Sequence, residues 1–430
     1  MMKLLCGIFA ALLTAGCVSG GMAGDSLNEI ASDYVQMQLE IGERDPGYVD
    51  AYHGPAEWQQ AAKSAPRSLE QLAQAATQLT ARVSAVDASR LDPMDQRRRN
   101  FLLAQLKAAD TRLRMIRGER LSFADEAEGL FGVRPELRDL SSFDAPLARL
   151  EQLVPGTGPL AERVEALQDR FTIPKDRLKP VFDAAIAECK RRTLQHIALP
   201  ANENFSMEFV TGKSWSGYNY YQGNATSLIQ INTDFPIRIS RAVDLGCHEG
   251  YPGHHAYNLL LEQKLAKERG WVEFTLLPLY SPQAIIAEGS ANYGIELAFP
   301  GPERAAYETA ALYPLAGLTV ANAPQYSALL DAMREISGAR FTIARDYLDG
   351  KMTRDQAVAA AQKYQLLTKE RAEQSVTFTD EYRSYVINYG LGQDMVRAYV
   401  EAAGPTQEAR WKAFERVISE PTLPSDLTGR

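Results

Sequence analysis

The sequence is poor in cysteine and histidine, and both shortages restrict what the protein can be. Its 430 residues include only four cysteines and five histidines. Cys6 and Cys17 lie in the extreme N-terminal segment, so only Cys189 and Cys247 remain for the body of the protein. One disulfide between them is chemically allowed, but a fold held together by a network of disulfides is excluded.

Internal repeats, low-complexity linkers and an excess of positive charge are also missing. The absence of repeats argues against a solenoid or other repeat architecture. The formal net charge is -8, and an acidic surface repels the phosphate backbone, so we expect no nucleic acid partner. Hydrophobic residues make up 45% of the chain, as in proteins that form a globular core.

The first residues, "MMKLLCGIFAALLTAGC", have the pattern of a bacterial lipoprotein signal. Lys3 precedes an apolar run that is shorter than the ~20 residues needed to span a bilayer. We expect a signal peptide at 1–16, a lipidated Cys17 that tethers the protein to a membrane, and a short tether at 17–24. An ordinary cleaved signal is the alternative. Val18 favours the outer membrane, so the expected location is the bacterial cell envelope, facing the periplasm.

Apolar residues recur at helical spacing through most of the chain, which predicts a mainly α fold. Leu160, Val164, Leu167 and Phe171 share one helix face, and a capping-box pattern at Thr353 predicts another helix start. The runs "FSMEFV" and "SLIQIN" predict two strands of a small antiparallel sheet, separated by the turn-rich loop "TGKSWSGYNYYQGN".

The composition shifts near residue 195, where charged helical segments give way to a stretch that holds four of the five histidines. This shift predicts a helical N-terminal region at 25–195 and a catalytic region at 196–430. One fused domain is the alternative.

The motif "CHEGYPGHHAYN" at 247–258 begins like a zinc-protease signature and then departs from it. A hydrolytic zinc site needs three nitrogen or oxygen ligands, an open position for water and a nearby carboxylate that takes the proton of that water. His248 and Glu249 supply one ligand and the carboxylate. The second histidine of the usual motif would stand at position 252, where this chain has proline.

The spacing alone leaves two candidates for the second histidine. In an uninterrupted helix His254 lies well round the cylinder from His248, whereas His255 returns to the same face but lies ~10 Å along the axis. The pair Pro252-Gly253 can break the helix and so bring His254 into position, because proline removes a donor and glycine accepts unusual dihedrals.

The stretch "YSPQAIIAEGSANYGIELAF" is the best source of a third ligand. Ser281 and Pro282 are a good N-cap and first helical residue, which places Glu288 in the second turn of a helix. Asn292, one turn later, is suited to orient a metal-binding histidine through its other ring nitrogen. Glu296 is the competitor of Glu288 for the role of ligand.

These stretches resemble the bacterial family called domain of unknown function 885, a group of predicted metallopeptidases that includes lipoproteins. The matching segments are "HEGYPGHH", "AEGSANYGIE" and "SLIQINTDFP", with "DPGYVDAYHGPAEW" and "FADEAEGLFGVRP" upstream. The resemblance covers nearly the whole mature chain. It implies a mainly α, zincin-like fold, with a helical bundle-like body and the small sheet near the active site.

The resemblance also implies a gluzincin arrangement around one zinc ion per chain. His248, His254 and Glu288 would be the ligands and Glu249 the general base; the resemblance favours His254 over His255. The zinc ion would activate a water molecule for attack on a carbonyl, and Glu249 would take up its proton.

An oxyanion donor and the substrate-binding groups are expected elsewhere in the chain. The segment "SYVINYGLGQDMVRAY" offers Tyr385 and Tyr389, of which we choose Tyr389. By analogy with gluzincins, "SLIQIN" is a candidate sheet edge for an extended peptide. Arg397 and Lys213 are candidates to bind a substrate carboxylate.

The sequence therefore predicts a zinc-dependent hydrolase, in the first place a peptidase that acts on a peptide or small amide substrate. A metal-dependent amidase or esterase acting on a cell-envelope substrate is the first alternative. The second is a non-catalytic binding lipoprotein with a metal-stabilised core.

Overall fold

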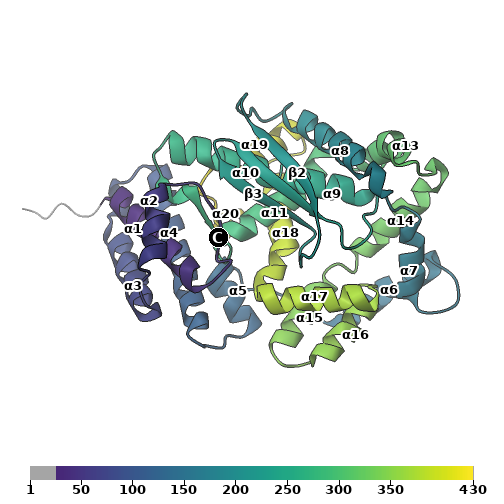
Figure 1. The fold of residues 1–430 in the computed structure, drawn as a ribbon, viewed down its shortest axis with the longest axis horizontal. Helices are drawn as coiled ribbons and strands as arrows, with labels where there is room; N and C mark the ends of the chain where they lie inside the picture. The colour runs from purple at the N-terminus through teal and green to yellow at the C-terminus, as the bar shows by residue number, and fades with distance from the viewer. Residues whose placement is uncertain (1–25, 430) are drawn as a thin grey trace, which may run out of the picture.

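The computed structural model describes residues 26–429 (Figure 1). The predicted signal peptide and Cys17 lie outside the described residues. Among the helices of residues 26–429, none is both long and apolar enough to cross a membrane.

Helices make up most of this structure, which confirms the prediction of a mainly α fold (Figure 1). The first group comprises α1 (Leu27–Arg44), α2 (Ala56–Ser64), α3 (Leu69–Ala85), α4 (Pro93–Ile116) and α5 (Phe123–Phe131). The middle group comprises α6 (Asp144–Leu153), α7 (Leu160–Asp169), α8 (Leu178–Thr193), α9 (Ser240–Glu249), α10 (His254–Leu261) and α11 (Pro282–Ala298). The last group comprises α12 (Glu303–Tyr307), α13 (Tyr313–Ala316), α14 (Ala323–Arg334), α15 (Ala339–Leu348), α16 (Arg354–Tyr364), α17 (Lys369–Tyr382), α18 (Leu391–Ala402), α19 (Gln407–Ser419) and α20 (Pro424–Leu427).

Local signals in the sequence locate several of these helices correctly. The capping box at Thr353 is present at the start of α16, where the Thr353 hydroxyl accepts from the Gln356 amide. α11 begins at Pro282 after Ser281, as predicted, although the Ser281 hydroxyl donates to the Pro278 carbonyl instead of capping the helix.

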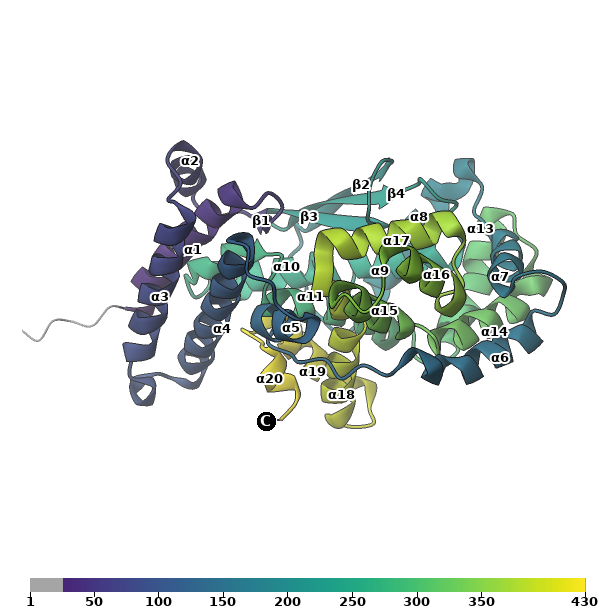
Figure 2. The same ribbon diagram turned by 90° about the horizontal axis from the view of Figure 1, so that it is seen from below.

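The first helices form an arm at one end of the molecule, seen on the left in Figures 1 and 2. α1, α3 and α4 pack against one another there. Their buried apolar residues belong to the same core cluster as Ile285 of α11 and as Val386 and Ile387, which lie far away in sequence. The division near residue 195 stays a prediction.

A three-stranded sheet lies over the central helices, and it corrects three expectations. Its strands are β2 (Asn204–Val210), β3 (Gly217–Gly223) and β4 (Thr226–Asn232), in the order β2-β4-β3. β3 occupies the segment predicted to be a loop and forms a tight hairpin with β4. β2 lies on the opposite side of β4 and pairs with it in parallel, so the sheet is mixed. β4, the run "SLIQIN", is central and offers no free edge to a peptide.

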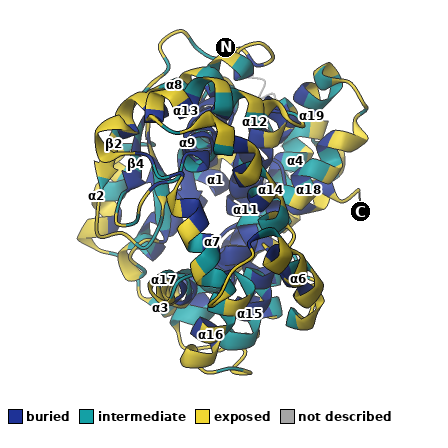
Figure 3. Ribbon diagram, turned by 90° about the vertical axis from the view of Figure 1, so that its right-hand side faces the viewer, coloured by how far each residue is buried: buried dark blue, intermediate teal, exposed yellow. Residues whose placement is uncertain are grey.

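A smaller sheet joins the N-terminal arm to the segment before α11. β1 (Val49–Tyr52) pairs with β5 (Leu276–Pro278) in antiparallel fashion. β1 also packs against β3, so this pairing brings Asp50 close to the central helices. α11 itself is buried along almost its whole length, and it appears in dark blue in Figure 3.

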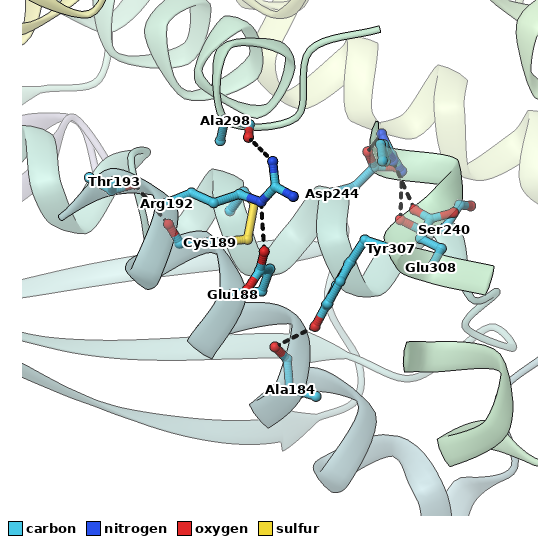
Figure 4. Close-up of a disulfide and its surroundings, with 12 residues drawn as sticks. Ala184, Glu188, Cys189, Arg192, Thr193, Ser240, Asp244, Ala298, Tyr307 and Glu308 are labelled. Carbon is cyan, nitrogen blue, oxygen red and sulfur yellow. Dashed lines mark hydrogen bonds and ion pairs between the residues drawn. A yellow bond between two sulfur atoms is a disulfide. The ribbon is translucent and has the colours of Figure 1, made fainter. Parts of the chain in front are cut away.

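Cys189 and Cys247 form a disulfide that ties α8 to α9 (Figure 4). Both cysteines are fully buried, and Cys247 is the residue directly before His248. On the neighbouring turns of α8, Arg192 binds Glu188 and the Ala298 carbonyl at the end of α11. The disulfide thus anchors the end of α9 that carries the histidine-glutamate pair.

We expect protein comprising residues 18–430 to lose stability when both cysteines are replaced by alanine. A bridge that spans 58 residues restricts the unfolded chain by about 4 kcal/mol at most, and strain or residual structure reduces this value. Denaturant unfolding of Cys189→Ala/Cys247→Ala should show a loss of about 2–4 kcal/mol. Thiol titration of the unreduced, denatured protein checks the bridge itself; two free thiols per chain would contradict it.

Candidate metal centre

The histidine motif is interrupted between two helices. α9 ends at Glu249, residues 250–253 are not helical, and α10 begins at His254. Within the interruption the Gly253 amide donates to the Cys247 carbonyl at 3.1 Å. A Cβ at position 253 would lie 1.9 Å from the His248 carbonyl oxygen, so only glycine fits. The predicted break at Pro252-Gly253 is confirmed, and it brings His254 beside His248.

Three side-chain atoms from three turns of helix converge at this point. His248 Nε2 lies 3.1 Å from His254 Nε2 and 3.2 Å from Glu288 Oε2. His254 Nε2 is 3.7 Å from the same carboxylate oxygen. The structure therefore brings together the three residues that the family resemblance implies as ligands.

The hydrogen bonds around His248 determine which of its ring nitrogens has a free electron pair. Asn292 donates through Nδ2 to the Tyr389 carbonyl at 2.8 Å, which leaves its Oδ1 to face His248 Nδ1 at 3.0 Å. Because this oxygen can only accept, Nδ1 carries the proton, and Nε2 of the neutral ring presents its electron pair to the centre. Asn292 thus occupies the position predicted for it, behind a candidate ligand.

The spacing of the three atoms fits a bound zinc ion. Ligands at ~2.0–2.1 Å in a tetrahedral arrangement lie about 3.3 Å from one another, within the range of the three distances measured here. Glu288 Oε2 is buried and has no hydrogen-bond partner of its own, whereas Oε1 accepts from the Tyr385 hydroxyl at 2.7 Å. A buried carboxylate oxygen that faces two imidazoles and lacks a donor is suited to a cation.

Two competing candidates for the ligand set lie elsewhere. Glu296 is exposed and binds Arg397 and Gln393 of α18. His255 points away from the centre, because its Nδ1 binds the Ser227 hydroxyl and its Nε2 binds Glu203. Since both ring nitrogens are engaged, His255 does not belong to this group, which corrects its inclusion as a lesser candidate.

Glu249 lies beside these three atoms in a buried position. Its carboxylate is 3% exposed, and the candidate ligand atoms of His248, Glu249 and His254 all lie within 4.8 Å of one another. Burial raises the pKa of Glu249 to about 7, where a carboxylate is able both to take up and to release a proton. The Asn219 amide on β3 donates to the Glu249 carbonyl at 2.7 Å and holds this turn against the sheet.

The two tyrosines of the C-terminal segment have different surroundings. Tyr385 is occupied with Glu288, as described above. The Tyr389 ring lies 6.4 Å from the His248 ring, measured between centroids, and also lines the cavity. Burial raises its pKa well above the ordinary value, so its hydroxyl stays protonated and available as a donor. The role of Tyr389 stays a prediction.

The centre opens into a large cavity of about 1800 Å³ between the sheet, α11 and the C-terminal helices. Its lining includes Asp50 and Arg340, two residues that the sequence did not indicate as part of the site. Burial raises the pKa of Asp50 to about 6, and the Tyr218 hydroxyl donates to its Oδ1 at 3.0 Å. Asp50 lies inside the segment "DPGYVDAYHGPAEW" that carries part of the family resemblance, whereas no signal distinguishes Arg340 among 46 lysines and arginines.

No protein-family model matches this sequence, and no curated protein matches it either. Among solved structures, the chain is similar to a predicted lipoprotein from Colwellia psychrerythraea, with 16% identity and a TM-score of 0.49; the match covers 84% of this chain and 66% of that protein. It is also similar to the M32 carboxypeptidase from Deinococcus radiodurans R1, with 15% identity, a TM-score of 0.39 and 94% of both chains covered.

We expect purified protein of residues 18–430 to bind about one zinc ion per chain, and His248→Ala to lose it, because the variant removes one of three convergent donors. Elemental analysis after removal of loosely bound metal measures the content. The matched control is His196→Ala, an exposed histidine that stacks on Trp411 away from the centre. Equal metal content in wild type and His248→Ala would contradict the site.

Asn292→Ala should weaken zinc binding by about 10–100-fold without abolishing it, because the imidazole of His248 loses the acceptor that fixes its tautomer. Competition with a chromophoric chelator measures the change. Asn258→Ala is the control, since Asn258 lines the same cavity but does not hydrogen-bond to His248 or His254 within residues 26–429. An affinity unchanged by Asn292→Ala would exclude the orienting role.

Proposed function

We propose that this protein is a zinc-dependent hydrolase that cleaves peptide bonds, with a gluzincin arrangement in a zincin-like fold. The observation that carries the proposal is the convergence of His248 Nε2, His254 Nε2 and Glu288 Oε2 beside the buried carboxylate of Glu249. We also propose that the protein is a member of the domain of unknown function 885 family, which it resembles.

A zinc ion on these three ligands would polarise a substrate carbonyl and lower the pKa of a bound water molecule to ~7. Glu249 accepts a proton from the attacking water at its carboxylate and then donates it to the leaving nitrogen. A raised pKa suits this exchange, because a carboxylate with an ordinary pKa would hold the proton too weakly at neutral pH. Asn292 and Tyr385 hold His248 and Glu288 in place during the reaction.

Tyr389 is proposed to donate its hydroxyl to the oxygen of the tetrahedral intermediate. Its position beside His248 and its protonated state support this role. The size of the cavity supports a substrate of peptide dimensions.

The proposed location is the bacterial cell envelope, in the outer membrane and facing the periplasm, with lipidated Cys17 as the tether. The buried disulfide supports a compartment outside the reducing cytoplasm, since disulfides persist in oxidising environments.

Glu249→Gln should retain zinc and lower peptide hydrolysis by about 10²–10⁴-fold, because the amide cannot take up the proton. A panel of mixed-sequence peptides, followed by mass spectrometry, measures turnover alongside metal content. Glu296→Gln is the matched control on α11, and we expect it to keep both zinc and activity.

The same experiment separates the alternative functions. Zinc binding without turnover of peptides, amides or esters in the wild type would favour a non-catalytic binding lipoprotein. Turnover that is confined to non-peptide amides or esters and lost in Glu249→Gln would keep the metal mechanism and change the substrate.

A further inference from the structure

Arg340 stands apart from the other arginines that line the cavity. Six of these arginines form ion pairs with carboxylates: Arg112, Arg241, Arg304, Arg334, Arg371 and Arg397. Arg340, the second residue of α15, has neither an acidic partner nor a hydrogen-bond partner among residues 26–429, and its Nε is buried. The side chain is partly buried and lines the cavity. Charged groups that are largely removed from water are normally paired, so this guanidinium is suited to an anionic group of a ligand.

Aromatic rings hold the guanidinium of Arg340 in place. Its Cζ lies 5.0 Å from the Phe378 ring centroid and 5.4 Å from that of Tyr389. Such cation-π contacts stabilise the charge and restrict the side chain without using its N–H groups. Burial lowers the pKa of Arg340, but Tyr389 and Glu288 act in the opposite direction, and a guanidinium stays charged at neutral pH.

Arg340 is near the candidate metal centre. The centroid of the Tyr389 ring lies 5.4 Å from Arg340 Cζ and 6.4 Å from the centroid of the His248 ring. The distance from the guanidinium to the His248 ring therefore cannot exceed the sum of these two values. An extended chain advances ~3.3–3.6 Å per residue. A group bound to Arg340 would therefore lie within about three residues of a carbonyl at the centre.

We propose that Arg340 binds a carboxylate of the substrate, so that the enzyme acts on peptides with a free carboxylate within about three residues of the scissile bond. This inference rests on the proposed peptidase function and narrows its substrate class. The planar fork of an arginine matches a carboxylate through two parallel N–H···O bonds. The group is either the C-terminal carboxylate or an acidic side chain.

Arg397, the earlier candidate for this role, does not share these features. It binds Glu296 and Asp394, so its charge is already compensated. Lys213, the other candidate, lies over the Trp215 ring in the loop before β3 and does not line the cavity.

Three sets of N-acetylated tripeptides with the same neutral core distinguish the two sources of the carboxylate. The first set has a free C-terminus, the second a C-terminal amide, and the third a C-terminal amide with glutamate as the last residue. We expect the wild-type zinc protein to cleave the first or the third set with a kcat/KM roughly 10²-fold above that of the neutral amides. Whichever acidic set is preferred identifies the source.

Arg340→Met should remove this preference, and Arg340→Lys should restore only part of it, because an ammonium keeps the charge but not the fork. Zinc content and thermal unfolding show whether each variant is folded. Arg397→Met is the control and should keep the wild-type preference.

Two results would overturn the inference while leaving the peptidase function intact: equal cleavage of all three sets by the wild type, or an acidic preference that persists in folded Arg340→Met. A zinc-bound wild type that cleaves none of the peptides, including the mixed-sequence panel, would overturn the peptidase proposal and the inference with it.

Discussion

The rest of the structure depends on one constraint, which is that three electron-rich side-chain atoms lie close together in a largely buried site. Two imidazole nitrogens and a carboxylate oxygen lie 3.1–3.7 Å apart, away from bulk water. Such a group is unfavourable unless a proton or a metal cation lies between the atoms, because the negative ends of the three groups otherwise face one another with reduced hydration. The surrounding protein must therefore hold each of them in place, and the packing around the centre fulfils this requirement.

Covalent and steric devices hold the backbone that carries these groups. The disulfide anchors α9 directly before His248, and the close approach at Gly253 starts α10 where His254 reaches the centre. On the other side, Gly289 lets α11 contact α18 closely; a Cβ there would lie 2.3 Å from the backbone of Gly392. The segment with Tyr385 and Tyr389 also packs against α11, and there the Tyr385 hydroxyl donates to Glu288.

The charges in the cavity follow a consistent arrangement. Most of the arginines that line it form ion pairs with carboxylates, so their charges are already compensated within the protein. Two carboxyl groups near the centre behave differently, since burial raises the pKa of both Asp50 and Glu249, whereas His254 and His248 hold the pKa of Glu288 well below its ordinary value despite its burial. Arg340 adds a positive charge without an ion-pair partner among residues 26–429 to this region, which suits an anionic group on a ligand.

Much of the candidate site was predictable because its signals are local. The histidine-glutamate pair, the helix break at Pro252-Gly253 and the start of α11 at Pro282 all reflect backbone preferences within a few residues. Helix phase then places Glu288 and Asn292 one turn apart on the same side of α11. The zinc ligation and the catalytic roles of these residues stay predictions, although the structure brings the side chains together.

By itself the sequence determined the helical character of the chain and narrowed the residues at the centre to His248 and Glu249, one of the two histidines His254 and His255, and one of the two glutamates Glu288 and Glu296. Only the tertiary structure decided the parallel pairing of β2 with β4, the disulfide, the engagement of His255 with Ser227 and Glu203, and the isolation of Arg340. Each of these depends on contacts between segments far apart in the sequence. The presence or absence of such a contact is set by how the whole chain packs, and no local pattern records it.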